Sequence, residues 1–108
     1  MGWSVETLNR TVDKEIEVFP ADVRARLAHI GKLIAEVGLE RVGMPYVRHL
    51  SGPLWEMRVR GKDEIARALY VTIREQRIVI VRAFAKKTRK TPRREIDLAL
   101  KRAQEILT

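Results

Sequence analysis

Three apolar segments in the second half of the chain, joined by short turns, limit the possible folds more than any other feature. In the first segment apolar and polar residues alternate, as in a strand with one buried face. The other two are mostly apolar. Parallel strands need a crossover of a dozen or more residues, so turns this short indicate antiparallel pairing. The sequence therefore predicts an antiparallel meander with strands at 54–60, 65–72 and 78–81.

Helical spacing of apolar residues marks the chain on both sides of the meander. The second of three expected helices is the clearest, because its apolar residues form one stripe that ends at Gly38, a common helix-terminating residue. We expect a strand at 2–7, helices at 8–19, 23–37 and 93–107, and a loop at 38–53. The order is β-α-α-β-β-β-α. This pattern is typical of an α+β fold with a small antiparallel sheet and helices packed on one face.

The composition indicates one intracellular domain. The chain has 108 residues, 45% of them hydrophobic, which is enough for one core and leads us to expect a single domain over 1–108. It has no cysteine, so disulfides, thiolate metal sites and cysteine nucleophiles are excluded. The N-terminus lacks the pattern of a secretory signal, and no segment is apolar enough to cross a membrane. We expect a cytoplasmic protein without a membrane partner.

Positive charge is concentrated in the second half of the chain. Residues 1–50 contain seven Lys/Arg and seven Asp/Glu, whereas residues 51–108 contain fifteen and seven, so the net charge of +8 arises there. Between Arg82 and Arg94 there are seven positive residues and no negative one. Such asymmetry favours a polyanionic partner, above all nucleic acid, because neutralised phosphates release condensed counterions. The alternative is a solvated surface that only aids solubility.

Four basic residues are placed by the meander to form one surface. Arg58 lies on the polar side of the first strand, Arg67 interrupts the apolar second strand, and Lys86 and Lys87 follow the third. With the strands paired in register, these residues converge on a basic concave face suited to an RNA backbone. The alternative reading of Arg67 is structural, as an arginine that pairs with Glu56 or reaches the sheet edge.

Several motifs resemble the phage-derived, HigB-like branch of the RelE toxin superfamily. They are the run Leu-Ser-Gly-Pro-Leu-Trp-Glu-Met-Arg at 50–58, Ala-Arg-Ala-Leu-Tyr at 66–70, Phe-Ala-Lys-Lys-Thr-Arg-Lys-Thr-Pro at 84–92, and the helix opening Glu95-Ile96. The resemblance extends from residue 3 to the last helix. It implies a RelE-like fold and the toxin of a type II toxin–antitoxin pair, with a helix-turn-helix antitoxin as partner.

The resemblance also implies an activity. Such toxins are metal-independent endoribonucleases, without a cofactor, that cut messenger RNA during translation on the ribosome. The ribose 2′-hydroxyl attacks the adjacent phosphate and leaves a 2′,3′-cyclic phosphate and a 5′-hydroxyl. On this reading Arg67 contacts the scissile phosphate, Arg58 is a basic residue of the neighbouring strand, and Lys86 and Lys87 form the basic pair after the last strand. RNA-binding residues are expected at Arg60, Lys62, Arg82, Arg89, Lys90, Arg93 and Arg94.

Two departures from this family pattern leave alternatives open. Glu56 stands where the best-known relatives have a lysine, so the general base is not assigned, and His49 is one candidate. No aromatic residue follows Phe84, so Tyr70 or Trp55 would have to stack on a base unless both belong to the core. The competing functions are a gyrase-directed toxin of the same fold and a non-catalytic module that binds nucleic acid or antitoxin.

Overall fold

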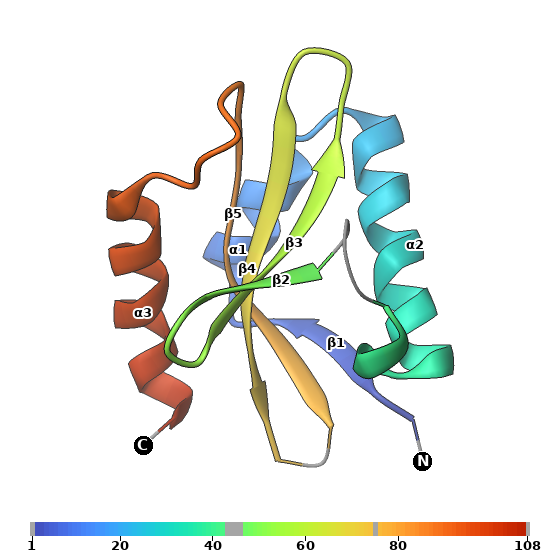
Figure 1. Ribbon diagram of the computed structural model, residues 1–108, viewed down its shortest axis with the longest axis vertical. Coiled ribbons are helices and arrows are strands. Elements are labelled where there is room, and N and C mark those ends of the chain that lie inside the picture. The colour runs from blue at the N-terminus through green and yellow to red at the C-terminus, as the bar shows by residue number, and fades with distance from the viewer. Residues whose placement is uncertain (1, 43–46, 75, 108) are drawn as a thin grey trace.

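A five-stranded sheet forms the centre of the computed structural model, which describes residues 2–42, 47–74 and 76–107 (Figure 1). Residues 43–46 of the expected loop and residue 75 of the expected turn lie outside this description. The spatial order of the strands is β1-β5-β4-β3-β2. Their bounds are β1 Ser4–Thr7, β2 Val47–Ser51, β3 Leu54–Arg60, β4 Ile65–Ile73 and β5 Arg77–Lys86.

The predicted meander is confirmed by β3, β4 and β5. Both neighbouring pairs are antiparallel, with Arg58 opposite Arg67 and Arg67 opposite Phe84. Strand β5 extends to Lys86, beyond the predicted end at residue 81. The sheet as a whole is mixed, because β1 pairs with β5 in the parallel direction. The expectation of a purely antiparallel sheet is therefore wrong at this edge.

Strand β2 lies where the sequence predicts a loop. It pairs antiparallel to β3, with Val47 opposite Met57 and His49 opposite Trp55. Its register shifts between His49 and Ser51. This irregularity hides the period of two that a strand normally shows in its sequence, so the pattern at 47–51 did not reveal a strand.

The three helices follow the predicted order. They are α1 (Arg10–Glu17), α2 (Ala21–Val37) and α3 (Arg93–Leu107), with a short 3-10 turn η1 (Leu39–Arg41) after α2. The Asn9 side chain caps α1 by accepting a hydrogen bond from the Val12 N–H at 3.1 Å. Gly38 ends α2 with a φ of +88°, a value that suits glycine. No helix within the described residues is long and apolar enough to span a membrane.

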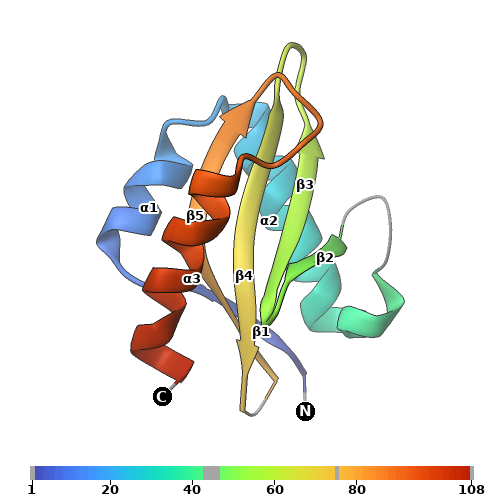
Figure 2. The same ribbon diagram turned by 60° about the vertical axis from the view of Figure 1, so that its left-hand side comes forward.

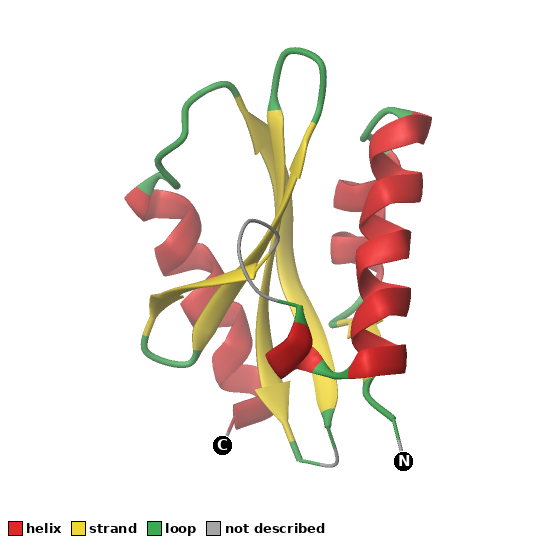
Figure 3. Cartoon of the chain, turned by 45° about the vertical axis from the view of Figure 1, so that its right-hand side comes forward, coloured by secondary structure: helices red, strands yellow, loops and turns green. Residues whose placement is uncertain are grey.

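The helices cover both faces of the sheet, which corrects the expectation of one covered face. Helices α1 and α2 lie on one side and α3 on the other (Figures 2 and 3). Along β4, Ala68 and Tyr70 pack on the α2 side, whereas Leu69 and Val71 pack on the α3 side. The nearly continuous apolar run of β4 is the sequence signal of a strand buried on both faces.

Side chains from α1 and α3 cover the part of the β5 edge that lies beyond β1. A Glu15 carboxylate oxygen accepts a hydrogen bond from the Ala83 N–H at 3.0 Å, and Arg102 donates to the Val81 carbonyl at 2.9 Å. Glu15 and Arg102 also pair with each other at 3.0 Å. Polar groups of an open strand edge are thereby satisfied within the chain. This clamp fixes the end of β5 that precedes the basic residues.

Candidate nucleic-acid interface

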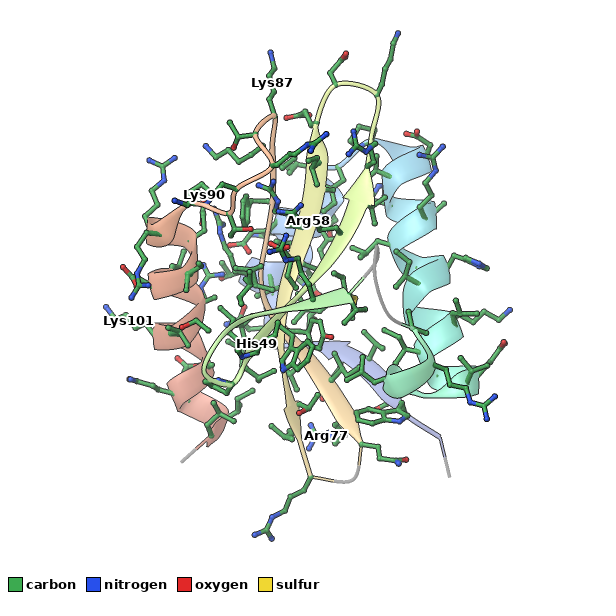
Figure 4. All side chains as sticks on the ribbon, in the orientation of Figure 1. His49, Arg58, Arg77, Lys87, Lys90 and Lys101 are labelled. Atoms are coloured by element: carbon green, nitrogen blue, oxygen red, sulfur yellow. The ribbon has the colours of Figure 1, made fainter. Side chains whose placement is uncertain are left out.

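Arg58 and Arg67 lie directly opposite each other on β3 and β4. Their side chains share the α3 face of the sheet, in the centre of the molecule, where Figure 4 shows Arg58. Like charges in opposite positions of an antiparallel pair repel each other. The two arginines therefore require a negative group nearby, and they form a natural receptor for an anion.

Glu56 is the negative group that contacts these arginines. It is fully buried and lies on β3, two residues before Arg58 and on the same face. Its Oε1 accepts a hydrogen bond from the Arg58 Nε at 2.6 Å, and its Oε2 lies 3.9 Å from the Arg67 Nε. Arg48 on β2 adds a third guanidinium, with its Nε 4.0 Å from Oε1. One carboxylate thus faces three cations.

A basic loop, defined here as residues 87–92, folds over the two arginines. The Arg67 Nη2 donates to the Thr88 carbonyl, and the Arg58 Nη2 donates to the Arg89 carbonyl. The Thr91 hydroxyl donates to Glu56 Oε2. Thr91 thus ties the loop to the sheet. The loop presents backbone acceptors to the arginines and directs the side chains of Thr88 and Arg89 to solvent.

Arg67 is completely buried in this arrangement, with an exposed fraction of 0%. Within the described part of the chain its Nε and Nη1 have no hydrogen-bond partner. Its guanidinium carbon lies 5.8 Å from the centre of the Phe84 ring. Burial, followed by the nearby charge of Arg58, lowers the pKa of Arg67, while Glu56 acts in the opposite direction. An arginine stays protonated at neutral pH, so Arg67 is a buried cation with unused donors.

The lysine pair lies at the end of β5, toward one end of the molecule and away from the central Arg58 (Figure 4). Lys86 is the half-buried last residue of β5, opposite Ile65. Lys87 is exposed and points away from the body of the protein (Figure 4). The charge of Lys86 helps to lower the pKa of Glu95 on α3, behind the larger effects of Arg82 and Arg94. Lys86 is two residues after Phe84 on β5 and so lies on the α3 face of the sheet.

Two of the expected RNA-binding residues have carboxylate partners. Arg82 pairs with Glu15 at 2.8 Å and with Glu95 at 2.7 Å, which balances its charge within the chain, and its expected role in RNA binding stays a prediction. Arg93 pairs with Asp97 one helical turn later at 3.1 Å, although both side chains are exposed. The remaining expected residues are exposed around the β3–β4 hairpin and the basic loop, namely Arg60, Lys62, Arg89, Lys90 and Arg94.

The aromatic and histidine alternatives lie on the opposite face of the sheet. Tyr70 is fully buried in the α2-side core, where burial raises the pKa of its hydroxyl, and Trp55 packs at the border of that core. The His49 ring bonds the Gly52 carbonyl at 2.8 Å and meets the Trp55 ring edge to face. These contacts give His49 and Tyr70 structural roles. The described residues also hold no group of three His, Asp or Glu side chains suited to a metal ion.

Sequence reasoning missed two members of the site. Arg48 lies on the unpredicted strand β2, and Thr91 reaches Glu56 across 35 residues of sequence. The shared face of Glu56 and Arg58 follows from strand alternation, so part of the site is visible in the sequence. No local pattern signals that the loop after β5 turns back onto the sheet.

Comparison with known proteins gives a family and a fold. The model of a family described as phage-derived Gp49-like proteins matches residues 14–104. No curated protein matches the chain. Among solved structures, the free E. coli toxin RelE, as a mutant with two arginines replaced by alanine, is 14% identical with a TM-score of 0.63, and the alignment covers 100% of both chains.

A second similar structure is the archaeal RelE–RelB complex of Pyrococcus horikoshii OT3. Its matching chain is 20% identical with a TM-score of 0.58, and the alignment covers 83% of this chain and 100% of that one. At these identities the similarity establishes the fold alone. The predicted RelE-like α+β fold is thereby confirmed.

Proposed function

Since the chain belongs to the family of phage-derived Gp49-like proteins and has the fold of RelE toxins, we propose that it is the toxin of a type II toxin–antitoxin pair. Its activity is the cleavage of translated mRNA at the ribosome, and its partner is a helix-turn-helix antitoxin. The observation that carries the activity is a surplus of positive charge on the sheet, where the half-buried Arg58 and the buried Arg67 face one carboxylate, Glu56. The RelE–RelB complex among the similar structures supports the antitoxin partner.

The reaction requires stabilisation of a phosphate that gains negative charge. The 2′-oxygen bonds to phosphorus as its proton leaves, and the bond from phosphorus to the 5′-oxygen breaks as that oxygen takes up a proton. The products are a 2′,3′-cyclic phosphate and a 5′-hydroxyl. Arg67 and Arg58 supply forked donors for the non-bridging oxygens, where charge grows in the transition state. The groups that accept and donate the protons are left unassigned.

RNA has to displace the basic loop to reach Arg67. The carbonyl oxygens of Thr88 and Arg89 accept hydrogen bonds from Nη2 atoms of the two arginines. A phosphate offers oxygens of greater negative charge to the same donors, so it can replace both carbonyls. The exposed Lys87, Arg89 and Lys90 on the loop would then contact neighbouring phosphates.

Brief expression of the chain without an antitoxin is expected to stop growth and cut mRNA within translated regions. Mapping of the 5′ ends of cellular RNA checks this, since the new ends carry a 5′-hydroxyl. Purified protein is expected to cut ribosome-bound mRNA equally well with and without a chelator. Uncut mRNA with trapped gyrase–DNA complexes would instead indicate a gyrase-directed toxin. RNA binding without cleavage would indicate a non-catalytic module.

Two paired neutralisations are expected to separate binding from turnover. The variant with Arg89→Gln and Lys90→Gln should bind all RNA sequences more weakly and lower the salt slope by about one to two units, because exposed side chains contact phosphates. Cleavage of bound RNA should be unchanged, since Arg58 and Arg67 are retained. The variant with Lys86→Gln and Lys87→Gln should also lower turnover.

Single-turnover cleavage at saturating ribosome concentration, with binding measured over a salt series, distinguishes these results. Equal salt slopes and unchanged cleavage in both double variants would assign the lysine pair to electrostatic attraction only.

A further inference from the structure

Glu56 faces the Nε side of both central arginines, with a hydrogen bond to Arg58 and an ion-pair distance to Arg67. It lies at the Nε atoms of Arg58 and Arg67, at 2.6 and 3.9 Å, while an Nη2 atom of each guanidinium points to the basic loop. One side of each guanidinium thus faces the carboxylate, and the other is available to a phosphate that replaces the loop carbonyls. A planar guanidinium held on one side presents its remaining donors in a fixed direction.

The oxygens of Glu56 are already occupied by the protein. Oε1 accepts from Arg58, and Oε2 accepts from the Thr91 hydroxyl. The side chain is fully buried, beneath the loop that covers Arg67. A general base needs an oxygen within reach of the proton that it removes. These contacts place Glu56 behind the arginines with respect to the RNA.

The charges around Glu56 give it a second effect. Arg58 and Arg67 are opposite neighbours, and Arg48 lies at 4.0 Å from the same carboxylate. Without Glu56, the guanidinium groups would repel one another and leave their present positions. With Glu56, net positive charge still remains for a phosphate.

We propose that Glu56 is a positioning residue of the ribonuclease site, which orients Arg58 and Arg67 toward the phosphate and docks the basic loop through Thr91. The proposal rests on the proposed function of the chain. Glu56 does not touch RNA and takes no proton from it. Its replacement therefore changes the rate of cleavage more than the binding of RNA.

The test compares Glu56→Gln with Glu64→Gln, which removes the same charge from an exposed position on the β3–β4 turn. Single-turnover cleavage per folded molecule is expected to fall about 10- to 100-fold in Glu56→Gln, the range found when partners that orient metal ligands are lost. RNA affinity should be equal or higher, because a negative charge is removed. The pH profile should keep its shape. Glu64→Gln should cleave at the wild-type rate.

A measurement independent of activity is the melting temperature in a sulfate series. Sulfate should raise the melting temperature of Glu56→Gln more than that of wild type or Glu64→Gln, because an added anion can take the place of the lost carboxylate. The Glu56→Asp variant keeps the charge with a shorter reach. Its rate of cleavage should lie between those of wild type and Glu56→Gln. If Glu56→Gln does not fold, Glu56→Asp alone tests the proposal, and its rate of cleavage should be several-fold below that of wild type.

Three results would overturn the proposal. Wild-type cleavage per folded molecule in Glu56→Gln or Glu56→Asp would give Glu56 a purely structural role. Loss of the acidic limb of the pH profile would make it a general base. Equal sulfate responses of Glu56→Gln and wild type would show that Glu56 does not hold the arginines. The sulfate comparison can be made even if the wild-type chain cleaves no RNA. It therefore distinguishes failure of the proposed function from failure of the proposal for Glu56.

Discussion

Arg67→Met is expected to lower the rate of RNA cleavage per folded molecule by about 10²–10³-fold, the scale for the loss of one donor that stabilises charge in a transition state. The reason is the buried guanidinium of Arg67, whose Nε and Nη1 have no hydrogen-bond partner in the described structure. Arg67→Ala should lose activity to the same extent. Single-turnover cleavage, corrected for the folded fraction by circular dichroism, measures the effect.

The stability of Arg67→Met should equal or exceed that of wild type. A buried charge whose donors lack hydrogen-bond partners costs free energy, and Arg67→Met removes such a group. Methionine fills much of the volume of the arginine stem, and Glu56 retains Arg58 at 2.6 Å. Arg67→Lys provides the matched comparison, because it keeps the charge and loses the forked donors. Earlier melting with unchanged cleavage would instead make Arg67 a structural partner of Glu56.

The parts of the fold that follow from the sequence depend on regular periods. The stripe of α2 contains Val23, Leu27, Ile30 and Ile34, all of them buried, because a period of 3.6 places them on one face. Alternation in β3 likewise places Glu56 and Arg58 on one side, away from Met57. Where a period is regular, the sequence determines which face a side chain occupies.

Irregular pairing accounts for two features that the sequence did not reveal. In β2 the register shifts after His49, so its strand pattern is broken. In β5 a second shift leaves Val81 as an extra residue between Ile80 and Arg82, whose partners Tyr70 and Leu69 are adjacent. This bulge places Arg82 on the α3 face, where it meets Glu95. One extra residue in the strand thus decides on which face of the sheet Arg82 lies, and the strand propensities of the residues do not reveal the bulge.

The closure of the basic loop depends on contacts between distant segments. The acceptors for Arg58 and Arg67 are backbone carbonyls at 89 and 88, and every residue type has such a group. The identity of these residues therefore carries no signal of the contact. The seven positive residues within 82–94 suggested one surface for a polyanion, whereas the structure divides them among ion pairs, the basic loop and the start of α3. Only the folded chain separates these roles.

Arg82→Met is expected to have the opposite effect from Arg67→Met, with lower stability and unchanged cleavage per folded molecule. Arg82 pairs with both Glu15 and Glu95, and its removal leaves the half-buried Glu15 and the buried Glu95 with fewer partners. We expect a loss of about 2–4 kcal/mol in the free energy of unfolding at pH 7, somewhat less than for a fully buried pair. Denaturant unfolding measures it. Arg77→Met on the same strand is the control, since its exposed pair with Glu6 should contribute under about 1 kcal/mol.

The pH dependence identifies the cause of this loss. The hydrogen bond from Arg82 is the main reason that the pKa of Glu95 lies below its usual value of 4.5. A carboxylate with a lowered pKa stabilises the fold above its unfolded pKa and loses that contribution as pH falls through its folded pKa. The difference in free energy of unfolding between wild type and Arg82→Met should therefore have its largest value above about pH 5 and decrease as pH falls below 4.5. A difference that stayed constant down to pH 3 would attribute the loss to packing against Phe84, and a parallel loss of cleavage per folded molecule would return Arg82 to the RNA surface.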